Sequence, residues 1–167
     1  GNIVHFVSRK AFDIEGLGQE IINTFNKNGY LNDVADIYNL KAHKNDLMDM
    51  DGFGEKSISN LLNSIEKSRR IDLHKLIYSL GISEVGEATS RNLAQEYKNI
   101  DSFLEADFDQ LLEIDDIGPK VASNIVNYIK TDFAQSLLPR IIKELDILEV
   151  DEVNLADLPL NGVLVVL

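Results

Sequence analysis

The chain has 167 residues, of which 44% are hydrophobic and 26% charged, with a formal net charge of −12 and no cysteine. This length and composition fit a globular protein of one or two small domains with a real core. They exclude disulfides and thiolate metal sites, and the short apolar runs and missing signal pattern exclude a membrane span and favour a cytoplasmic location.

In chain order, the first predicted elements are a short extended segment at residues 2–8 and then helices that pair around glycine turns. Helical spacing predicts pairs at about residues 10–15 with 19–28, 43–50 with 55–69, 72–80 with 87–97, and 107–114 with 119–130. A connecting helix is expected over residues 31–40, and its apolar side consists of Val34, Ile37, Tyr38 and Leu40. A short helix is expected after Asn99, capped by Asp101 or Ser102.

The C-terminal part of the sequence has a different character. Apolar residues at helical spacing predict a helix over residues 133–148, with Pro139 near its start or at a kink. Half of residues 149–154 are acidic, and this stretch is expected to form a linker. The run of valine and leucine at residues 163–167 has the pattern of a buried strand.

One five-residue pattern recurs at the turn of each predicted helix pair. An apolar residue, two further positions, a second apolar residue and a glycine make up hairpin 1 (residues 14–18), hairpin 2 (50–54), hairpin 3 (82–86) and hairpin 4 (114–118). The final glycines lie 36, 32 and 32 residues apart. Such a period predicts a repeat architecture. The expected fold is therefore all-α, with four helix–hairpin–helix units, a C-terminal helix and a terminal strand.

The glycines of these turns predict an anion site. Glycine tolerates positive φ and allows close approach of another backbone, and a helix that starts after it has unpaired first amides. Those amides and the helix dipole bind phosphate without a basic side chain. The candidate phosphate-binding residues are Gly16, Gly18, Gly52, Gly54, Lys56, Gly86, Gly118 and Lys120. The alternative is that the glycines are turn and cap residues of a helical bundle, and that the lysines lie on solvated helix faces.

The four copies differ at the third position of the pattern. Hairpins 1 and 2 have Gly16 and Gly52 there, whereas hairpins 3 and 4 have Glu84 and Asp116. Because a carboxylate repels a phosphate, hairpins 1 and 2 are the stronger candidates and the acidic hairpins could instead hold the bundle together. At Gly18 and Gly54, a β-branched residue is expected to disturb both the turn geometry and the close approach of a ligand.

The repeated pattern resembles the helix-hairpin-helix motif, which binds the DNA backbone without reading sequence. Several longer strings resemble, in order, the bacterial NAD-dependent DNA ligase family over roughly residues 3–130. These strings are His5-Phe6-Val7-Ser8-Arg9, Asp13-Ile14-Glu15-Gly16-Leu17-Gly18, Gly52-Phe53-Gly54-Glu55-Lys56-Ser57, Leu80-Gly81-Ile82 with Val85-Gly86-Glu87, and Ile117-Gly118-Pro119.

This resemblance implies a domain organisation. Residues 1–8 would lead in from an absent four-cysteine zinc finger, and residues 9–131 would form the helix-hairpin-helix domain with its four motifs in two pseudo-symmetric pairs. Residues 132–158 would be the helix and acidic linker, and residues 159–167 the start of a truncated BRCT domain. The resemblance also implies that the complete enzyme seals 5′-phosphate/3′-hydroxyl nicks in replication and repair with NAD, Mg²⁺ and Zn²⁺. This fragment would be non-catalytic and would hold nicked duplex DNA beside the upstream catalytic domains of the same chain.

The charge opposes a DNA-binding function. Residues 1–130 contain 14 Lys+Arg against 21 Asp+Glu, so the repeat region is itself acidic. Local clustering of basic residues matters more for DNA binding than the total charge: Lys67, Arg69, Arg70 and Lys75 are close in sequence, and Arg9 and Lys10 precede hairpin 1. No catalytic or metal-binding constellation is present, since the three histidines are far apart in sequence. Two alternatives therefore remain: a non-enzymatic helix-hairpin-helix scaffold of another repair or recombination factor, and an acidic helical protein-interaction module.

Overall fold

Most segments in which apolar residues have helical spacing are helical in the structure. The computed structural model describes residues 2–148. Its helices are α1 (Asn2–Phe6), α2 (Gln19–Lys27), the 3-10 helix η1 (Val34–His43), α3 (Lys44–Met48), α4 (Glu55–Ser68), α5 (Leu73–Ser79), α6 (Glu87–Tyr97), α7 (Ile100–Leu104), α8 (Phe108–Leu112), α9 (Pro119–Ile129), the π-helical η2 (Phe133–Leu137) and α10 (Leu138–Ile142). The mostly helical fold is therefore confirmed. The predicted acidic linker and terminal strand lie outside the described residues.

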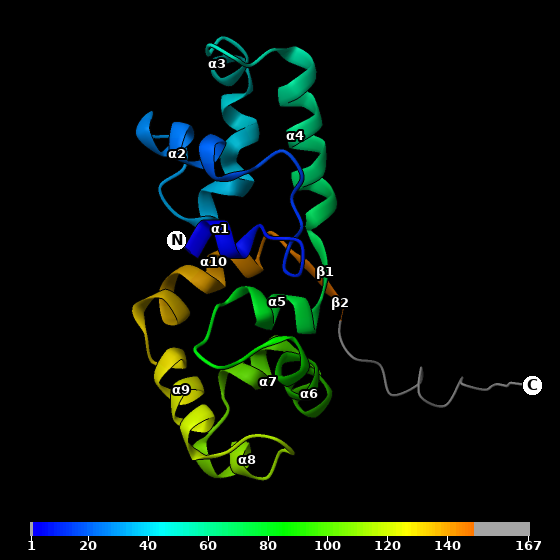
Figure 1. Cartoon of the computed structure of the whole chain (residues 1–167), viewed down its shortest axis with the longest axis vertical. Coiled ribbons are helices and arrows are strands. Elements are labelled where there is room, and N and C mark those ends of the chain that lie inside the picture. The colour runs from blue at the N-terminus through cyan, green and yellow to red at the C-terminus, as the bar shows by residue number, and fades with distance from the viewer. Residues whose placement is uncertain (1, 149–167) are drawn as a thin grey trace, which may run out of the picture.

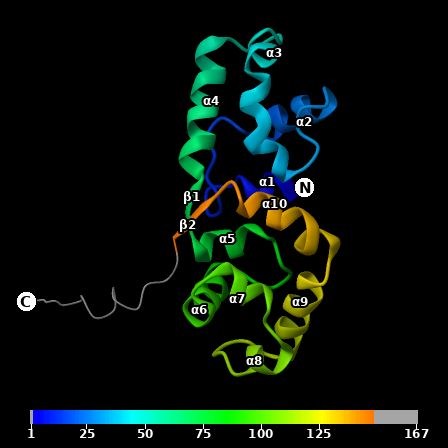
Figure 2. The ribbon, with the colours of Figure 1, turned by 180° about the vertical axis from the view of Figure 1, so that it is seen from behind.

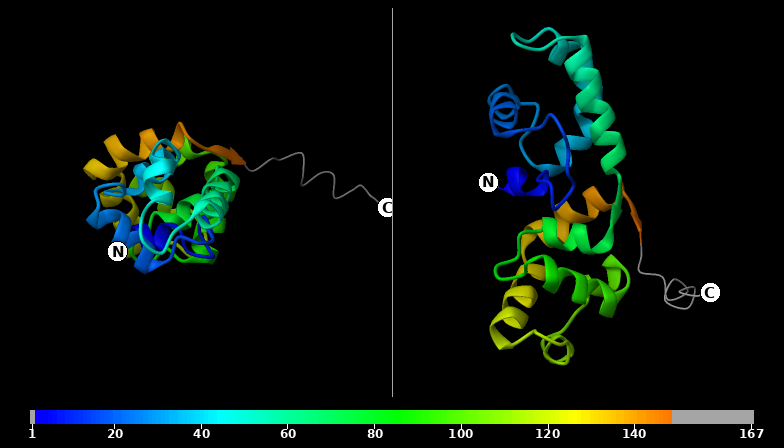
Figure 3. Two further views of the ribbon diagram at one scale, coloured as in Figure 1. Left: turned by 90° about the horizontal axis from the view of Figure 1, so that it is seen from above. Right: turned by 45° about the vertical axis from the view of Figure 1, so that its right-hand side comes forward.

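The molecule is elongated, and its two ends are built from different hairpins. Helices α2, α3 and α4, with η1, form one end, and α5 to α9 form the other (Figures 1 and 2). Helices α1 and α10 lie between the ends, as Figure 3 also shows. Buried side chains from both ends belong to one cluster, which includes Phe25 and Ile58 at one end and Leu93 and Ile125 at the other. The two ends thus share one continuous core.

The connecting helix is confirmed, with a different geometry and a later start. It begins at Val34 and is a 3-10 helix, and its four predicted apolar residues are all buried. Asp33 caps it by accepting a hydrogen bond from the amide of Ala35, and Asp36 accepts in return from the amide of Asp33. This reciprocal capping box fixes the start of the helix at residue 34 rather than 31.

The first fifteen residues differ from the prediction. Residues 2–6 are helical, not extended, because Ile3, Phe6 and Val7 lie on one helical face. The expected helix at residues 10–15 is absent, and that segment is a series of turns. The backbone reverses after Ser8, so that the ring of Phe12 stacks on that of Phe6 with centroids 4.0 Å apart. Burial of this aromatic pair outweighs the local helical pattern.

The segment predicted as one helix over residues 133–148 has three parts. The missing N–H of Pro139 interrupts the hydrogen bonds of a continuous helix, so η2 gives way to α10 with proline in its first turn. After α10 the chain forms β2 (Asp146–Leu148), which pairs in parallel with β1 (Arg70–Asp72). The register places Ile71 opposite Ile147. This strand pair was not predicted, since three residues are too few to show a period of two.

Candidate nucleic-acid interface

The four hairpins share one backbone geometry. In each, the amide of the fourth residue donates to the carbonyl of the first at 3.0 to 3.4 Å. The third residue is left-handed in every copy, with φ of +88° at Gly16, +86° at Gly52, +66° at Glu84 and +69° at Asp116. A positive φ at this place is what a type II turn requires. The repeat seen in the sequence is therefore a structural repeat of the turn, while pseudo-symmetry between pairs of hairpins stays a prediction.

The final glycine of each hairpin is the N-cap of the next helix and is extended, not left-handed. Gly18, Gly54, Gly86 and Gly118 precede α2, α4, α6 and α9, with φ between −79° and −154°. The expectation that Gly18 and Gly54 need a turn conformation closed to β-branched residues is thus wrong. The positive φ belongs to the residue two positions earlier.

Among residues 2–148, no neighbouring atom requires glycine at these four N-caps. A Cβ added at any of them would meet no neighbouring heavy atom within 4 Å. No side chain caps any of the four helices at this position, although serine, aspartate or asparagine would do so. Within residues 2–148, the amides at the first helical positions therefore have no side-chain acceptor, and the space in front of them is open. At α4 the amide of the N-cap residue Gly54 itself donates to Oγ of Ser57 at 3.1 Å.

Hairpin 1 contacts the hairpin 2 unit at one end of the molecule, and hairpin 3 contacts the hairpin 4 unit at the other. At the turn of Gly16, an added Cβ would lie 3.6 Å from Cδ1 of Leu61 on α4, and the rings of Phe25 and Phe53 are 5.5 Å apart. At the other end, the amide of the Asn124 side chain donates to the carbonyl of Ser83 at 2.9 Å. Hairpin 1 thus packs on the helix of hairpin 2, and the helix of hairpin 4 bonds to hairpin 3.

The two candidate lysines have different surroundings. Lys56 is exposed in the first turn of α4 and has no ion pair within the described residues. Lys120 is also exposed, and its Nζ lies 3.4 Å from a carboxylate oxygen of Glu84. Such an exposed pair contributes little to stability, but it places an anion beside the cation at hairpin 4.

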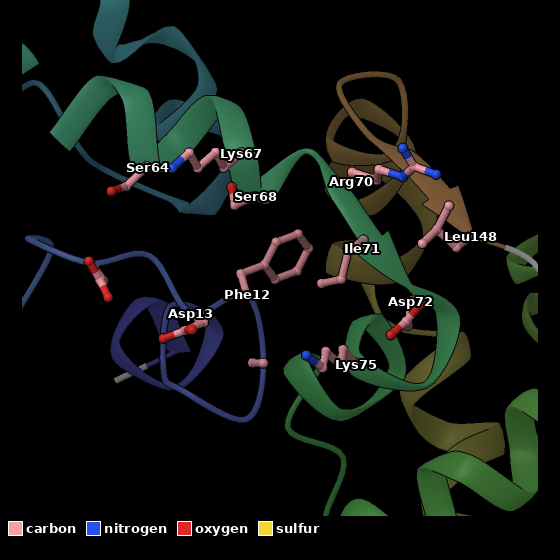
Figure 4. Close-up of a pocket in the computed structure, with 12 residues that line it drawn as sticks. Phe12, Asp13, Ser64, Lys67, Ser68, Arg70, Ile71, Asp72, Lys75 and Leu148 are labelled. Carbon is pink, nitrogen blue, oxygen red and sulfur yellow. The ribbon is translucent and has the colours of Figure 1, made fainter. Parts of the chain in front are cut away.

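Three of the four clustered basic residues surround a cleft of about 380 Å³. Lys67 extends from α4, Arg70 from β1 and Lys75 from α5 (Figure 4). Asp13 and Asp72 line the same cleft, so positive and negative charges alternate there. The cleft is consequently a mixed surface and not the basic face that the sequence cluster suggested.

Groups suited to metal binding are not assembled in residues 2–148. No cluster of three or more His, Cys, Asp or Glu side chains occurs among them. In that same part of the chain, no helix has the length and apolar character needed to cross a membrane.

Replacing the left-handed acidic residues by glycine is expected to stabilise the fold. Glu84→Gly and Asp116→Gly relieve a conformation that costs an L-residue roughly 1–2 kcal/mol, less the added chain entropy of glycine. The gain should be about 1 kcal/mol for Glu84→Gly and smaller for Asp116→Gly, because aspartate tolerates this region better. Chemical denaturation measures it. Ser83→Gly, one residue earlier and not left-handed, is the control and should destabilise.

Comparison with known proteins agrees with the geometry. The family profile for the helix-hairpin-helix motif matches residues 75–138. Proteins called DNA ligase from Natranaerobius thermophilus and Brevibacillus brevis are 40% and 36% identical over 99% of the chain. Another from Fusobacterium nucleatum is 43% identical over 83% of it. The chain spans about a quarter of the length of the first two relatives and 20% of the third. The predicted resemblance to the helix-hairpin-helix motif and to bacterial DNA ligases is confirmed, while NAD dependence and the BRCT start stay predictions.

Proposed function

We propose that this chain, which is related to one segment of the bacterial DNA ligases, binds duplex DNA. The contacts would be made by the backbone of its hairpins. The ligands would be phosphates of the DNA backbone, each held by the first amides of α2, α4, α6 or α9. Binding would be independent of base sequence, because phosphate contacts carry no base information.

The observation that carries this proposal is the set of N-cap glycines. Glycine at Gly18, Gly54, Gly86 and Gly118 has no internal role that a capping serine would not fill better. A phosphate at hydrogen-bond distance from the first amides would occupy the space that a side chain at this position would take. An external anion therefore accounts for all four glycines at once.

Local charge ranks the four hairpins. Between residues 99 and 119 there are seven acidic residues and no Lys or Arg. Asp115 and Asp116 are exposed immediately before Gly118, and Glu84 pairs with Lys120. Repulsion from these carboxylates weakens a phosphate site at hairpin 4 most. Hairpins 1 and 2 would carry the larger share of the affinity.

For the complete protein, we propose NAD-dependent sealing of nicks with a 5′-phosphate and a 3′-hydroxyl, in replication and repair. This chain would hold the duplex around the nick while other parts of the protein supply the chemistry. NAD and Mg²⁺ would be bound by those parts. Zn²⁺ would be bound there as well, since the chain has no cysteine for a thiolate zinc site. The segment proposed as a BRCT start, residues 159–167, lies outside the described residues.

The substitution Lys56→Ala tests the site at hairpin 2. It should weaken binding of nicked duplex and reduce the slope of log affinity against log salt by about 1, if Lys56 contacts one phosphate. Because Lys56 is exposed, the free energy of unfolding should change by less than about 0.5 kcal/mol. Fluorescence anisotropy at several salt concentrations, beginning at low salt, measures the affinity and its salt slope. Chemical denaturation measures the free energy of unfolding.

Lys44→Ala is the matched control. Lys44 is an exposed lysine in the first turn of α3, which has His43 and not glycine at its N-cap. It should leave the salt slope unchanged. An unchanged slope for Lys56→Ala as well would show that hairpin 2 is not a phosphate site. Absence of any duplex binding by the wild type, even at low salt, would contradict the DNA-binding function itself.

A further inference from the structure

The two ends of the molecule meet at a waist that contains α1. Hairpin 2 lies near one end of the long axis and hairpin 4 near the other (Figures 1 and 2). Helix α1 packs on α2 and η1, which belong to the first end. Helix α1 lies between the ends (Figure 3), and one of its side chains bonds to α5 in the second end. That side chain is His5.

His5 contacts the C-terminal end of α5 in three ways. Its Nε2 donates to the carbonyl oxygen of Tyr78 at 2.8 Å, so the imidazole carries a proton on Nε2. Its ring centroid lies 5.0 Å from that of Tyr78. Its Cδ2 lies against Gly81, where an added Cβ would come within 3.4 Å. Gly81 also has φ of +67°, so this place favours glycine for two reasons.

The partner of His5 is well suited to hold it. The carbonyl of Tyr78 lies in the last turn of α5 and already accepts from the amide of Gly81 at 3.1 Å. Its second lone pair accepts from His5, so both lone pairs of this helix-end carbonyl oxygen are hydrogen-bonded. Hairpin 3 begins at Ile82, directly after Gly81. The contact therefore fixes hairpin 3 relative to the end that carries hairpins 1 and 2.

We propose that His5 is a positioning residue for duplex binding: it fixes the angle between the two ends so that both engage one DNA duplex. This inference rests on the proposed function. When one end has bound the duplex, a rigid connection holds the other end near its own phosphates at a high effective concentration. A more flexible connection between the ends lowers that concentration and therefore the affinity. His5 contacts no DNA itself and acts through α5 and hairpin 3.

The test compares a long with a short duplex. A duplex of about 24 base pairs, roughly 80 Å at the rise of B-DNA, can reach both ends, and one of about 8 base pairs can occupy only one. His5→Ala should weaken binding of the long duplex by about fivefold to tenfold and leave the short duplex unchanged. His5→Gln should bind the long duplex within about twofold of the wild type, because its side-chain amide can donate to the same carbonyl.

The matched control is His43→Ala. The ring of His43 lies 5.0 Å from that of Tyr30, the same separation as in the His5 contact, but both residues belong to one end of the molecule. Loss of a comparable ring contact within one end should change the affinity for neither duplex.

A second readout does not depend on DNA. The chain has no cysteine, so two introduced cysteines, Glu20→Cys on α2 and Asn127→Cys on α9, can be spin-labelled without background. The distribution of distances between the two ends should broaden in His5→Ala and return to the narrow wild-type form in His5→Gln.

The outcomes separate this inference from the proposed function. Equal losses on both duplexes after correction for folded fraction, or an unchanged distance distribution in His5→Ala, would overturn the role of His5. Failure of the wild type to bind either duplex would overturn the DNA-binding function and, with it, the positioning role.

Discussion

Gly18→Asp is expected to weaken duplex binding by at least about tenfold, which corresponds to about 1.4 kcal/mol, while the melting temperature stays the same or rises. The carboxylate would accept hydrogen bonds from the first amides of α2 and favour the positive end of the helix dipole. The backbone at Gly18 is extended and the space around it is open, so the fold accepts the side chain without strain. The same carboxylate would occupy the phosphate site and repel DNA.

Opposite signs for stability and binding make this experiment decisive. If glycine at this position served only folding, stability and binding would change together. Asn23→Asp on the same helix adds the same charge away from the amides and should reduce affinity by less than about threefold, through screened repulsion alone. Gly18→Asp that binds like Asn23→Asp would show that the amides of α2 do not hold a phosphate. Anisotropy titration and thermal melting provide the two measurements.

Periodicity and turn chemistry made most of the helices predictable. The pairs around hairpins 2, 3 and 4 occur within a few residues of their expected bounds, because helix spacing and N-cap glycine act locally. The helix expected at residues 10–15 failed for a nonlocal reason, since the stacking of Phe12 on Phe6 reverses the chain. Asn99 caps α7 in place of Asp101 or Ser102, with its side chain accepting from the amide of Ser102.

The roles of individual glycines could not be read from the sequence. The pattern placed two glycines in hairpin 1 without showing that Gly16 supplies the positive φ and Gly18 the open N-cap. Glu84 and Asp116 looked like departures from the motif, yet they adopt the same left-handed conformation as glycine. Local backbone geometry thus tolerates several residue types at the third position. The open space at the N-caps of α2, α4, α6 and α9 becomes visible only when the neighbouring atoms are placed.

Arg69 is the residue whose role the sequence misrepresented most. It looked like part of a basic cluster for DNA, but its side chain is only 21% exposed and faces the protein. Its Nη1 donates to the carbonyl of Glu144 at 2.9 Å, its Nε bonds to Glu66, and its guanidinium lies 5.0 Å from the ring centroid of Tyr38. Burial raises the pKa of Tyr38 to about 12, against the opposing effect of its hydrogen bond with Ser68, so the ring stays neutral beneath the cation.

Arg69→Met should therefore destabilise the fold by about 2.5–4 kcal/mol. A charged hydrogen bond to a carbonyl contributes about 1.5–3 kcal/mol and a cation–π contact about 1 kcal/mol, while the ion pair with the half-exposed Glu66 adds little. Methionine retains the apolar part of the side chain, so the loss reports the guanidinium contacts. The backbone carbonyl of Arg69 also accepts from the amide of Asp146, next to the β1–β2 pair, and loosening there should lower the hydrogen-exchange protection of residues 144–148 first.

Arg70→Met is the matched control, since Arg70 is the next residue and is exposed at the cleft. It should change the free energy of unfolding by less than about 0.5 kcal/mol. Arg69→Lys should recover little of the loss, because a lysine cannot donate to Glu144 and Glu66 from one planar group while it lies over the ring of Tyr38. Equal effects of Arg69→Met and Arg70→Met on the unfolding free energy would contradict the structural role of Arg69. Weaker DNA binding at unchanged stability in Arg69→Met would instead return this residue to the DNA-binding surface.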